Sequence, residues 1–355
     1  MKGRWRACLL GGALGDALGY PVEFISSWKA IERAHGSNAP GHLAYAGPAP
    51  AVITDDTQMT LFVAEGLIRA AQRSRGRGIC HPPSVIRNAL LRWYATQVPG
   101  ASLSDGQKSG WLFREARLHQ RRAPGNTNLA ALRAQAGGAE MPDVQHPPND
   151  SKGCGAVMRS APIGLACNDA SAAFAMARDT GVITHGHPSG YLSAAYFAAV
   201  IHGVVRDASL PDAMDAADVL LAKERGRDEM TWAIAKAREV AARGVPDPTA
   251  IESLGGGWVG EQALAIALAC ALTVEGSSPD AFAAALWRAS LHGGDSDSTA
   301  SLTGNILGAM YGGASLPWLW LDDLELRDVV ERLAEDLFAS TALGRELDDL
   351  AYPAV

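Results

Sequence analysis

The sequence has little cysteine, and what it has is poorly placed for cross-linking. Five cysteines are scattered along 355 residues and none belongs to a C-x-x-C pair (Cys8, Cys80, Cys154, Cys167 and Cys270). Such a set indicates neither a disulfide framework nor a thiolate zinc site. A reducing compartment fits it best.

Positive charge and long apolar runs are also scarce. The chain carries 31 Lys and Arg against 38 Asp and Glu, a net charge of −7, so no overall basic field is present to recruit nucleic acid. Two local basic clusters are explained by solvated helix faces or loops (Arg73, Arg75, Arg77; Arg117, Arg121, Arg122). The longest largely apolar stretch, 263–274, is shorter than the roughly 20 residues of a membrane span. We therefore expect a cytoplasmic protein with neither nucleic acid nor membrane as a partner.

The N-terminus resembles a short signal peptide, because Lys2, Arg4 and Arg6 precede apolar residues. Asp16 and several glycines interrupt that apolar stretch, which favours a buried helix instead.

Helical periodicity dominates the chain, and alternating strand patterns are nearly absent. The pattern predicts helices near 4–19, 55–72, 84–96, 156–167, 171–182, 189–205, 212–223, 229–243, 261–275, 280–291, 298–311 and 325–338. Glycine is abundant, with 38 residues, and small residues recur every four positions in the first and eleventh of these helices (Gly11, Gly15, Gly19; Ala300, Gly304, Gly308, Gly312). This spacing puts them on one helix face, where a second backbone can approach closely.

The segments 35–53, 97–110, 119–152 and 244–260 are rich in Gly, Pro, Asn and Asp and are predicted to be irregular. Loops of such length inside a compact domain tend to be functional. Because helical pattern resumes after each one, we predict one all-α, many-helix domain over 1–355, with an irregular insertion at about 119–152.

Two motifs place carboxylates and hydroxyls just before helices. The first is Thr54-Asp55-Asp56-Thr57, and the second is Gly293-Gly294-Asp295-Ser296-Asp297-Ser298-Thr299. Helix capping alone explains one such residue in each motif. Adjacent carboxylates repel one another, however, unless a cation lies between them. Their hard oxygens suit Mg²⁺, Mn²⁺ or Ca²⁺ rather than zinc, and they form a one- or two-metal site if the two helix starts face each other.

Three further motifs are ambiguous when taken singly. Glu23 follows the first helix between apolar Val22 and Phe24, a setting that can perturb a carboxyl pKa for acid–base chemistry. The glycine-rich turn 151–159 can offer backbone N–H groups to a phosphate but is no P-loop. His185 and His187 lack matching ligands elsewhere, so lining of a polar pocket is favoured over metal binding.

In their order along the chain these motifs resemble the ADP-ribosylglycohydrolase family, to which dinitrogenase reductase-activating glycohydrolase and the ADP-ribosylarginine hydrolases belong. The resemblance covers about residues 7–312 and includes G-D-A-L-G-Y-P-V-E at 15–23, T-D-D-T at 54–57, G-C-G-A-V-M-R at 153–159, T-H-G-H-P at 184–188 and G-G-D-S-D-S at 293–298.

The resemblance implies an all-α fold with a binuclear Mg²⁺ centre, or Mn²⁺, in a cleft. Matching positions imply six metal ligands: Thr54, Asp55, Asp56, Asp295, Asp297 and Ser298. They also imply catalytic roles for Glu23 and Asp55, and an ADP-ribose site lined by Gly153, Cys154, Gly155 and His185. Cys154 stands where many members have Asn, which bears on substrate identity, whereas Ser298 in place of the commoner Thr keeps the hydroxyl oxygen.

The function expected from the resemblance is metal-dependent hydrolysis that removes ADP-ribose from a modified protein, with arginine the leading linkage. Two alternatives stay open. One is hydrolysis of another ADP-ribosyl linkage or of a small ADP-ribosyl metabolite. The other is an immunity-type protein that binds and neutralises an ADP-ribosyltransferase toxin.

Overall fold

The computed structural model describes residues 1–104 and 106–354, and in them the chain is a single helical domain. The named α-helices are α1 (Lys2–Gly19), α2 (Trp28–His35), α3 (Asp55–Arg77), α4 (Pro82–Gln97), α5 (Trp111–Arg114), α6 (Asn126–Ala136), α7 (Ala161–Ala166), α8 (Ala170–Gly181), α9 (Pro188–Val204), α10 (Leu210–Leu221), α11 (Asp228–Ala242), α12 (Pro248–Glu252), α13 (Gly260–Leu272), α14 (Pro279–Ser290), α15 (Ser296–Tyr311), α16 (Trp318–Asp323) and α17 (Arg327–Leu337). Within the described ranges, β-structure is limited to two isolated bridges, Ala51 with Leu324 and Gly153 with Val259.

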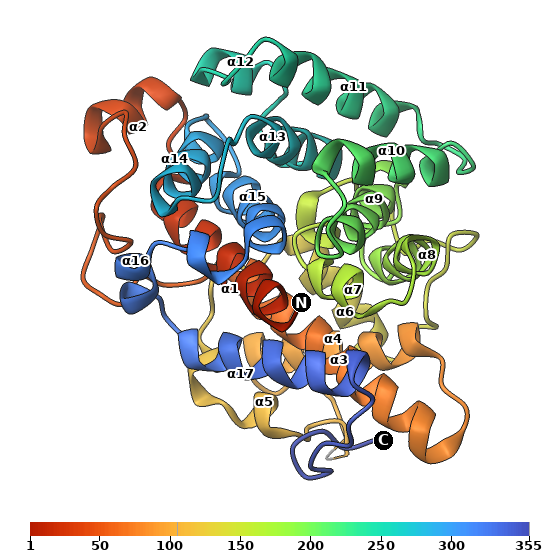
Figure 1. The fold of residues 1–355 in the computed structure, drawn as a ribbon. Helices are drawn as coiled ribbons and strands as arrows, with labels where there is room; N and C mark the ends of the chain where they lie inside the picture. Colours follow the sequence, from red (N-terminus) through yellow and green to blue (C-terminus); the bar gives the residue numbers. More distant parts are fainter. Residues whose placement is uncertain (105, 355) are drawn as a thin grey trace.

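Helices α1 and α15 cross at the centre of the molecule, and the other helices surround them (Figure 1). The small residues that recur every four positions in each helix, called here the glycine stripes, lie at this crossing, as predicted. A Cβ on Gly15 would lie 2.1 Å from the Ala300 carbonyl oxygen, and one on Gly304 would lie 2.0 Å from that of Gly11. Only residues without a side chain allow this separation, so the stripes let the two backbones touch.

This crossing brings the carboxyl end of α1 beside the amino end of α15. A Cβ on Gly19, the last residue of α1, would lie 2.2 Å from the carbonyl oxygen of Ser296, the first residue of α15. The chain then continues from Gly19 through the short helix η1 (Tyr20–Val22) to Glu23. The packing thereby puts Glu23 next to the second acidic motif.

The predicted helices are confirmed, with boundary shifts of a few residues, except for the one at 156–167. There the chain forms a 3₁₀ turn at Cys154–Ala156, and α7 begins only at Ala161. Pro162 lies in the first turn of α7, where its fixed φ starts a helix and its missing N–H costs nothing.

The prediction of irregular structure over 119–152 is wrong in part, because α6 occupies Asn126–Ala136 inside it. Helix α12 likewise lies in the segment 244–260, capped by the Asp247 side chain. Helices α2, α5 and α16 were also not predicted. These elements are short or lack a strong periodic pattern, so packing against the rest of the fold decides them.

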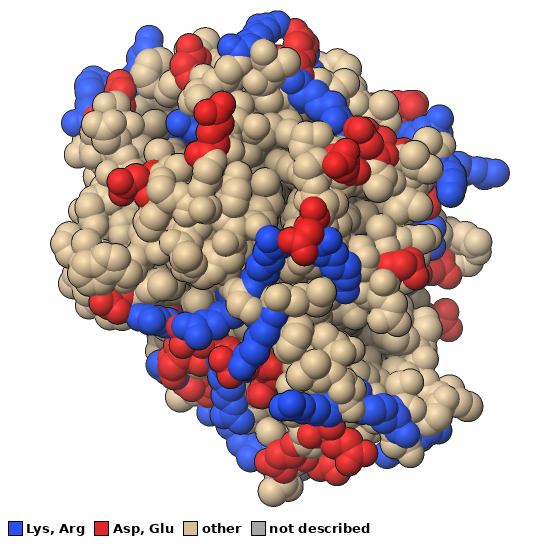
Figure 2. Space-filling view, viewed as in Figure 1, with Lys and Arg blue, Asp and Glu red and all other residues tan. Residues whose placement is uncertain are grey.

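Acidic and basic side chains are interspersed on the face in Figure 2. In the predicted basic clusters, Arg117 and Arg122 form ion pairs: Arg117 lies 2.8 Å from both Glu115 and Asp328, and Arg122 lies 2.8 Å from Glu325. Across the described residues, no helix combines the length and the apolar character that a membrane crossing requires.

Candidate active site

Three segments far apart in the sequence meet at one cavity of about 390 Å³, a volume typical of small-molecule sites. The turn after α1 contributes Glu23 and Phe24. The amino end of α3 contributes Asp55 and Asp56, and the amino end of α15 contributes Asp295, Asp297 and Ser298. The two helix starts therefore face each other across the cavity, the condition on which the sequence-based metal site depended.

The start of α3 is held by a carboxylate from α1. Asp16 is fully buried and accepts hydrogen bonds from the backbone N–H groups of Thr54 (3.0 Å) and Thr57 (3.1 Å), and from the Thr57 hydroxyl. Thr54 is the N-cap, its hydroxyl oxygen accepting from the Asp56 N–H at 3.2 Å. Together these bonds satisfy amide groups that a helix start leaves unpaired. Asp16 thus positions the start of α3, a role that its place in the motif 15–23 did not indicate.

A direct hydrogen bond connects the two acidic motifs, because the Ser298 hydroxyl donates to Asp56 Oδ2 at 2.8 Å. Within the second motif, the Ser298 backbone N–H donates to Asp297 Oδ1 at 2.9 Å. From the side of the cavity that faces the two helix starts, the Cys154 thiol donates to Asp295 Oδ2 at 2.8 Å. The acidic side chains are consequently fixed by neighbours rather than free in solvent.

Burial raises the pKa of every carboxyl in this group, and repulsion between carboxylates adds to it for Glu23, Asp55, Asp56 and Asp297. Burial is the largest cause for Glu23 and Asp55, each with a pKa raised to about 8, and repulsion from nearby aspartates adds to it. Burial raises the Asp16 pKa to about 6. The pKa values of Asp56 and Asp297 are raised well above the usual range by burial first and then by neighbouring carboxylates. Without an opposing charge the fully ionised cluster is therefore unfavourable.

The donor set fits a divalent cation. Oxygens of Glu23, Asp295 and Asp297 lie within 4.8 Å of one another. The Glu23 Oε2 atom is buried and has no hydrogen-bond partner, although buried polar atoms are normally satisfied. Hard oxygen donors gathered at this density are the ligands that Mg²⁺, Mn²⁺ and Ca²⁺ prefer.

The opposite wall is formed by Gly153, Cys154, Gly155 and His185, which all line the cavity as predicted. A Cβ on Gly155 would lie 2.8 Å from His185 Cε1, so glycine is required where the imidazole packs on this turn. Burial lowers the His185 pKa to about 3, which keeps the ring neutral at pH 7.

The buried Arg159 guanidinium organises this wall from behind. It donates to the Asn128 side chain (2.9 Å), the Gly155 carbonyl (2.6 Å) and the Thr184 hydroxyl (2.8 Å). The Thr184 hydroxyl in turn lies 2.8 Å from His185 Nδ1. Because Thr184 accepts from Arg159, its own hydrogen is free for Nδ1, which favours the tautomer with Nε2–H.

Helix α6 supplies part of the cavity that sequence reasoning missed. The Gly125 N–H donates to Asp55 Oδ2 at 3.1 Å, and Asn126, Thr127 and Asn128 line the cavity. No motif marked these residues. Phe24 and Trp258 also line the cavity. Phe24 was named only as an apolar neighbour of Glu23, and Trp258 lies in the segment 244–260, which was predicted to be irregular.

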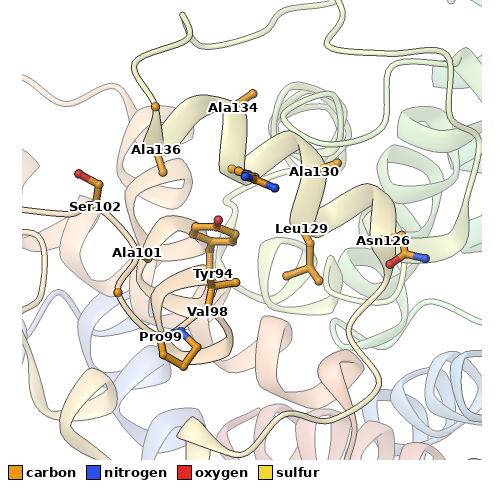
Figure 3. A pocket seen from close by; sticks show the side chains of 13 residues that line it. Tyr94, Val98, Pro99, Ala101, Ser102, Asn126, Leu129, Ala130, Ala134 and Ala136 are labelled. Carbon is orange, nitrogen blue, oxygen red and sulfur yellow. The ribbon is translucent and has the colours of Figure 1, made fainter.

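A larger cavity, about 1020 Å³, lies between α6 and the segment 98–102 (Figure 3). Its lining is mostly small and apolar, with Tyr94 and Leu129 among the larger side chains, and no carboxylate lines it in the part of the chain described. Asn126 borders both cavities. The smaller cavity, which holds the carboxylates, is therefore the candidate active site.

Of the predicted site residues, Glu23, Asp55, Asp56, Gly153, Cys154, Gly155, His185, Asp295, Asp297 and Ser298 all line this one cavity. Thr54 is fully buried and is not part of its lining, although it immediately precedes Asp55.

Comparisons with known proteins identify the family of the chain. The family model for ADP-ribosylglycohydrolase matches residues 1–346. The ADP-ribosylarginine hydrolase Tri1 of Serratia proteamaculans (strain 568) is 26% identical over 349 residues, which cover 94% of this chain and 78% of that protein. An uncharacterised protein of Archaeoglobus fulgidus is also 26% identical, over 340 residues that cover 95% of this chain and 97% of the relative.

The fold is also similar to a solved chain described as an ADP-ribosylglycohydrolase-related protein complex. The TM-score is 0.65 at 24% sequence identity, with 96% of this chain and 98% of the other covered. The family match spans nearly the whole sequence, and the ordered motifs of that family converge on one cavity. The chain therefore belongs to the ADP-ribosylglycohydrolase family, a family of hydrolases.

Proposed function

We propose that this protein is a metal-dependent hydrolase that removes ADP-ribose from modified arginine side chains. The observation that carries the proposal is the convergence of five carboxylates from three distant segments on one small cavity, in a chain of this family. The relative named as an ADP-ribosylarginine hydrolase supports arginine as the linkage.

The residues proposed to hold two Mg²⁺ or Mn²⁺ ions are Thr54, Asp55, Asp56, Asp295, Asp297 and Ser298. When bound, such ions would supply positive charge that orients the distal ribose hydroxyls and favours ionisation of water. They would also offset the repulsion that raises the carboxyl pKa values in their absence.

The chain's own residues do the rest of the proposed chemistry. Gly153, Cys154, Gly155 and His185 bind the ADP-ribose, with glycine N–H groups and the neutral imidazole as donors. Glu23, whose Oε2 has no other partner, accepts the proton of the attacking water. Asp55 is the second proposed catalytic residue, because a neighbouring carboxylate stabilises the positive charge that develops on the ribose ring.

The test is release of ADP-ribose from an arginine-modified protein. We expect release in Mg²⁺ or Mn²⁺, loss after exhaustive removal of divalent metal, and recovery when either ion is restored. Asp55→Ala and Asp297→Ala should lose turnover and metal affinity together, because each leaves the cation under-coordinated. Full activity of the demetallated protein would contradict the metal assignment.

The first alternative is hydrolysis of another ADP-ribosyl linkage or of a small ADP-ribosyl metabolite. Parallel assays with a serine-linked substrate and with a small ADP-ribosyl metabolite distinguish it from hydrolysis of the arginine linkage. Preference for either would leave hydrolysis of ADP-ribosyl bonds in place and remove arginine as the linkage. A toxin-neutralising binder without hydrolytic activity would release no ADP-ribose from any of these substrates.

A further inference from the structure

Two exposed aromatic rings stand at the candidate active site. Phe24 is 73% exposed and Trp258 is 46% exposed, although both are large apolar side chains. Their ring centroids are 6.1 Å apart with an interplanar angle of 29°, and both side chains line the cavity that holds the carboxylates. Neither the packing of the core nor the proposed hydrolysis accounts for them. Exposed aromatic surface at a polar cavity indicates a ligand contact.

The backbone that carries Trp258 is held on two sides. The Cys154 N–H donates to the Trp258 carbonyl at 3.2 Å, and the Asp295 N–H donates to the Gly256 carbonyl at 2.8 Å. A Cβ on Gly294 would lie 1.9 Å from that same Gly256 oxygen. The backbone of residues 256–258 therefore packs directly against the turn before α15 on one side and against Cys154 on the other. Phe24 follows Glu23 directly, in a turn closed by a bond from the Ile25 N–H to the Val22 carbonyl at 3.0 Å. The ring pair is therefore placed by the same backbone that places the acidic residues.

The charge of the cavity bears on which chemical group of a ligand is most favourable beside these rings. Five carboxylates line it, while no Lys or Arg does so among the residues described, and His185 is neutral. A cation beside the rings is attracted by their electron-rich faces, and any carboxylate charge that bound metal leaves unneutralised adds to this attraction. A neutral adenine would gain stacking alone.

We propose that Phe24 and Trp258 form a subsite for the guanidinium of the modified arginine. This inference rests on the proposed hydrolysis of arginine-linked ADP-ribose. Guanidinium is planar and weakly hydrated, and it stacks on aromatic faces. In the reaction, water oxygen forms a bond to C1″ of the ribose while the bond from C1″ to the guanidinium nitrogen breaks. One water proton goes to Glu23, and the other stays on the new C1″ hydroxyl. The neutral guanidine that leaves takes the proton back from Glu23, so arginine departs as a guanidinium cation beside the ring pair.

Steady-state hydrolysis of ADP-ribosylarginine and calorimetric binding of ADP-ribose test this subsite, since ADP-ribose lacks the arginine. We expect Trp258→Leu and Phe24→Leu each to lower kcat/KM for ADP-ribosylarginine by about 3- to 30-fold, the range of one cation–π contact. The Kd for ADP-ribose should change by less than about twofold. Trp258→Phe keeps an aromatic face and should retain more of the activity than Trp258→Leu. Trp232→Leu on α11, an exposed tryptophan outside the cavity, is the matched control and should change neither quantity.

An equal loss in kcat/KM and in ADP-ribose affinity would overturn the proposal and assign the rings to the adenosine. No change in either variant, or identical losses for Trp258→Phe and Trp258→Leu, would also overturn it. A wild-type protein that cleaves only other ADP-ribosyl linkages would remove the guanidinium subsite while ADP-ribosyl hydrolysis stands. A metal-loaded wild-type protein that cleaves no ADP-ribosyl substrate would instead contradict the proposed function itself.

Discussion

The protonation and reactivity of single side chains in this cavity depend on their neighbours. The Cys154 thiol, for example, donates to Asp295 Oδ2 at 2.8 Å. Burial, followed by repulsion from Asp295 and Asp56, raises the pKa of Cys154 well above its ordinary value, so the sulfur keeps its proton. A nucleophilic thiolate is not favoured here.

Glu23 is the residue for which a structural and a catalytic role predict different results. Glu23→Gln keeps the shape of the side chain but cannot accept the proton of water. General base catalysis contributes about 10²–10⁴-fold, so we expect kcat to fall by that order with little change in ADP-ribose affinity. Single-turnover kinetics and calorimetry on the metal-loaded protein measure the two quantities.

Glu32→Gln on α2, outside the cavity lining, is the matched control for Glu23→Gln and should behave as the wild type. An unchanged kcat in Glu23→Gln would shift the base role to Asp55, Asp56 or Asp295. Lost affinity with unchanged kcat would make Glu23 a binding residue.

At the scale of elements, the crossing of α1 and α15 holds the acidic groups together. Gly15→Ala would place a methyl group 2.1 Å from the Ala300 carbonyl oxygen, so the helices must separate. Overpacking costs typically about 1–3 kcal/mol, so we expect a lower free energy of unfolding by that amount. Because α1 also holds the start of α3 through Asp16, the same crossing positions Asp55 and Asp56 relative to Asp295 and Asp297, so metal affinity should fall as well. Urea unfolding and metal titration measure the two effects.

Gly76→Ala in α3 is the control, since a Cβ at Gly76 meets nothing within 4 Å. A helical Gly→Ala change without a clash stabilises by about 0.5–1 kcal/mol. If Gly15→Ala were as stable as Gly76→Ala, the close crossing would have no energetic importance.

For the whole molecule, the acidic cluster links metal binding to stability and pH. In metal-free protein the folded-state pKa values of Asp16, Glu23 and Asp55 are raised to about 6, 8 and 8. Because these exceed the unfolded values of roughly 4, the folded state binds more protons between about pH 4 and pH 8. The stability that these groups contribute is therefore present at low pH and lost as pH rises through the folded pKa values.

Bound cations would offset this loss, so the stabilisation by Mg²⁺ should grow with pH. We expect the difference in Tm between Mg²⁺-loaded and metal-free protein to increase from pH 5.5 to pH 8.5 in a thermal unfolding series. His185 and His292, whose pKa values burial lowers, titrate in both samples and do not by themselves create such a difference. A difference that stays flat or shrinks with rising pH would count against a cation among these carboxylates.

Local signals in the sequence determined most of the helices and the residues of both acidic motifs. The 3.6-residue periodicity placed α1, α3 and α15, and hydroxyl or carboxyl residues marked where α3 and α15 begin. The glycine stripes indicated a close helix contact, because four-residue spacing puts small residues on one face. These features depend on neighbours in the chain, which is why sequence alone was sufficient for them.

Tertiary structure alone decided which of these features meet. No spacing along the chain relates Glu23 to Asp297, and only the touching backbones of α1 and α15 bring their oxygens within 4.8 Å of Asp295. The same holds for Asp16, which caps α3 from α1, for the residues of α6, and for the stacked rings of Phe24 and Trp258. Each of these arrangements is a long-range contact, and its free energy comes from burial and packing that no local pattern records.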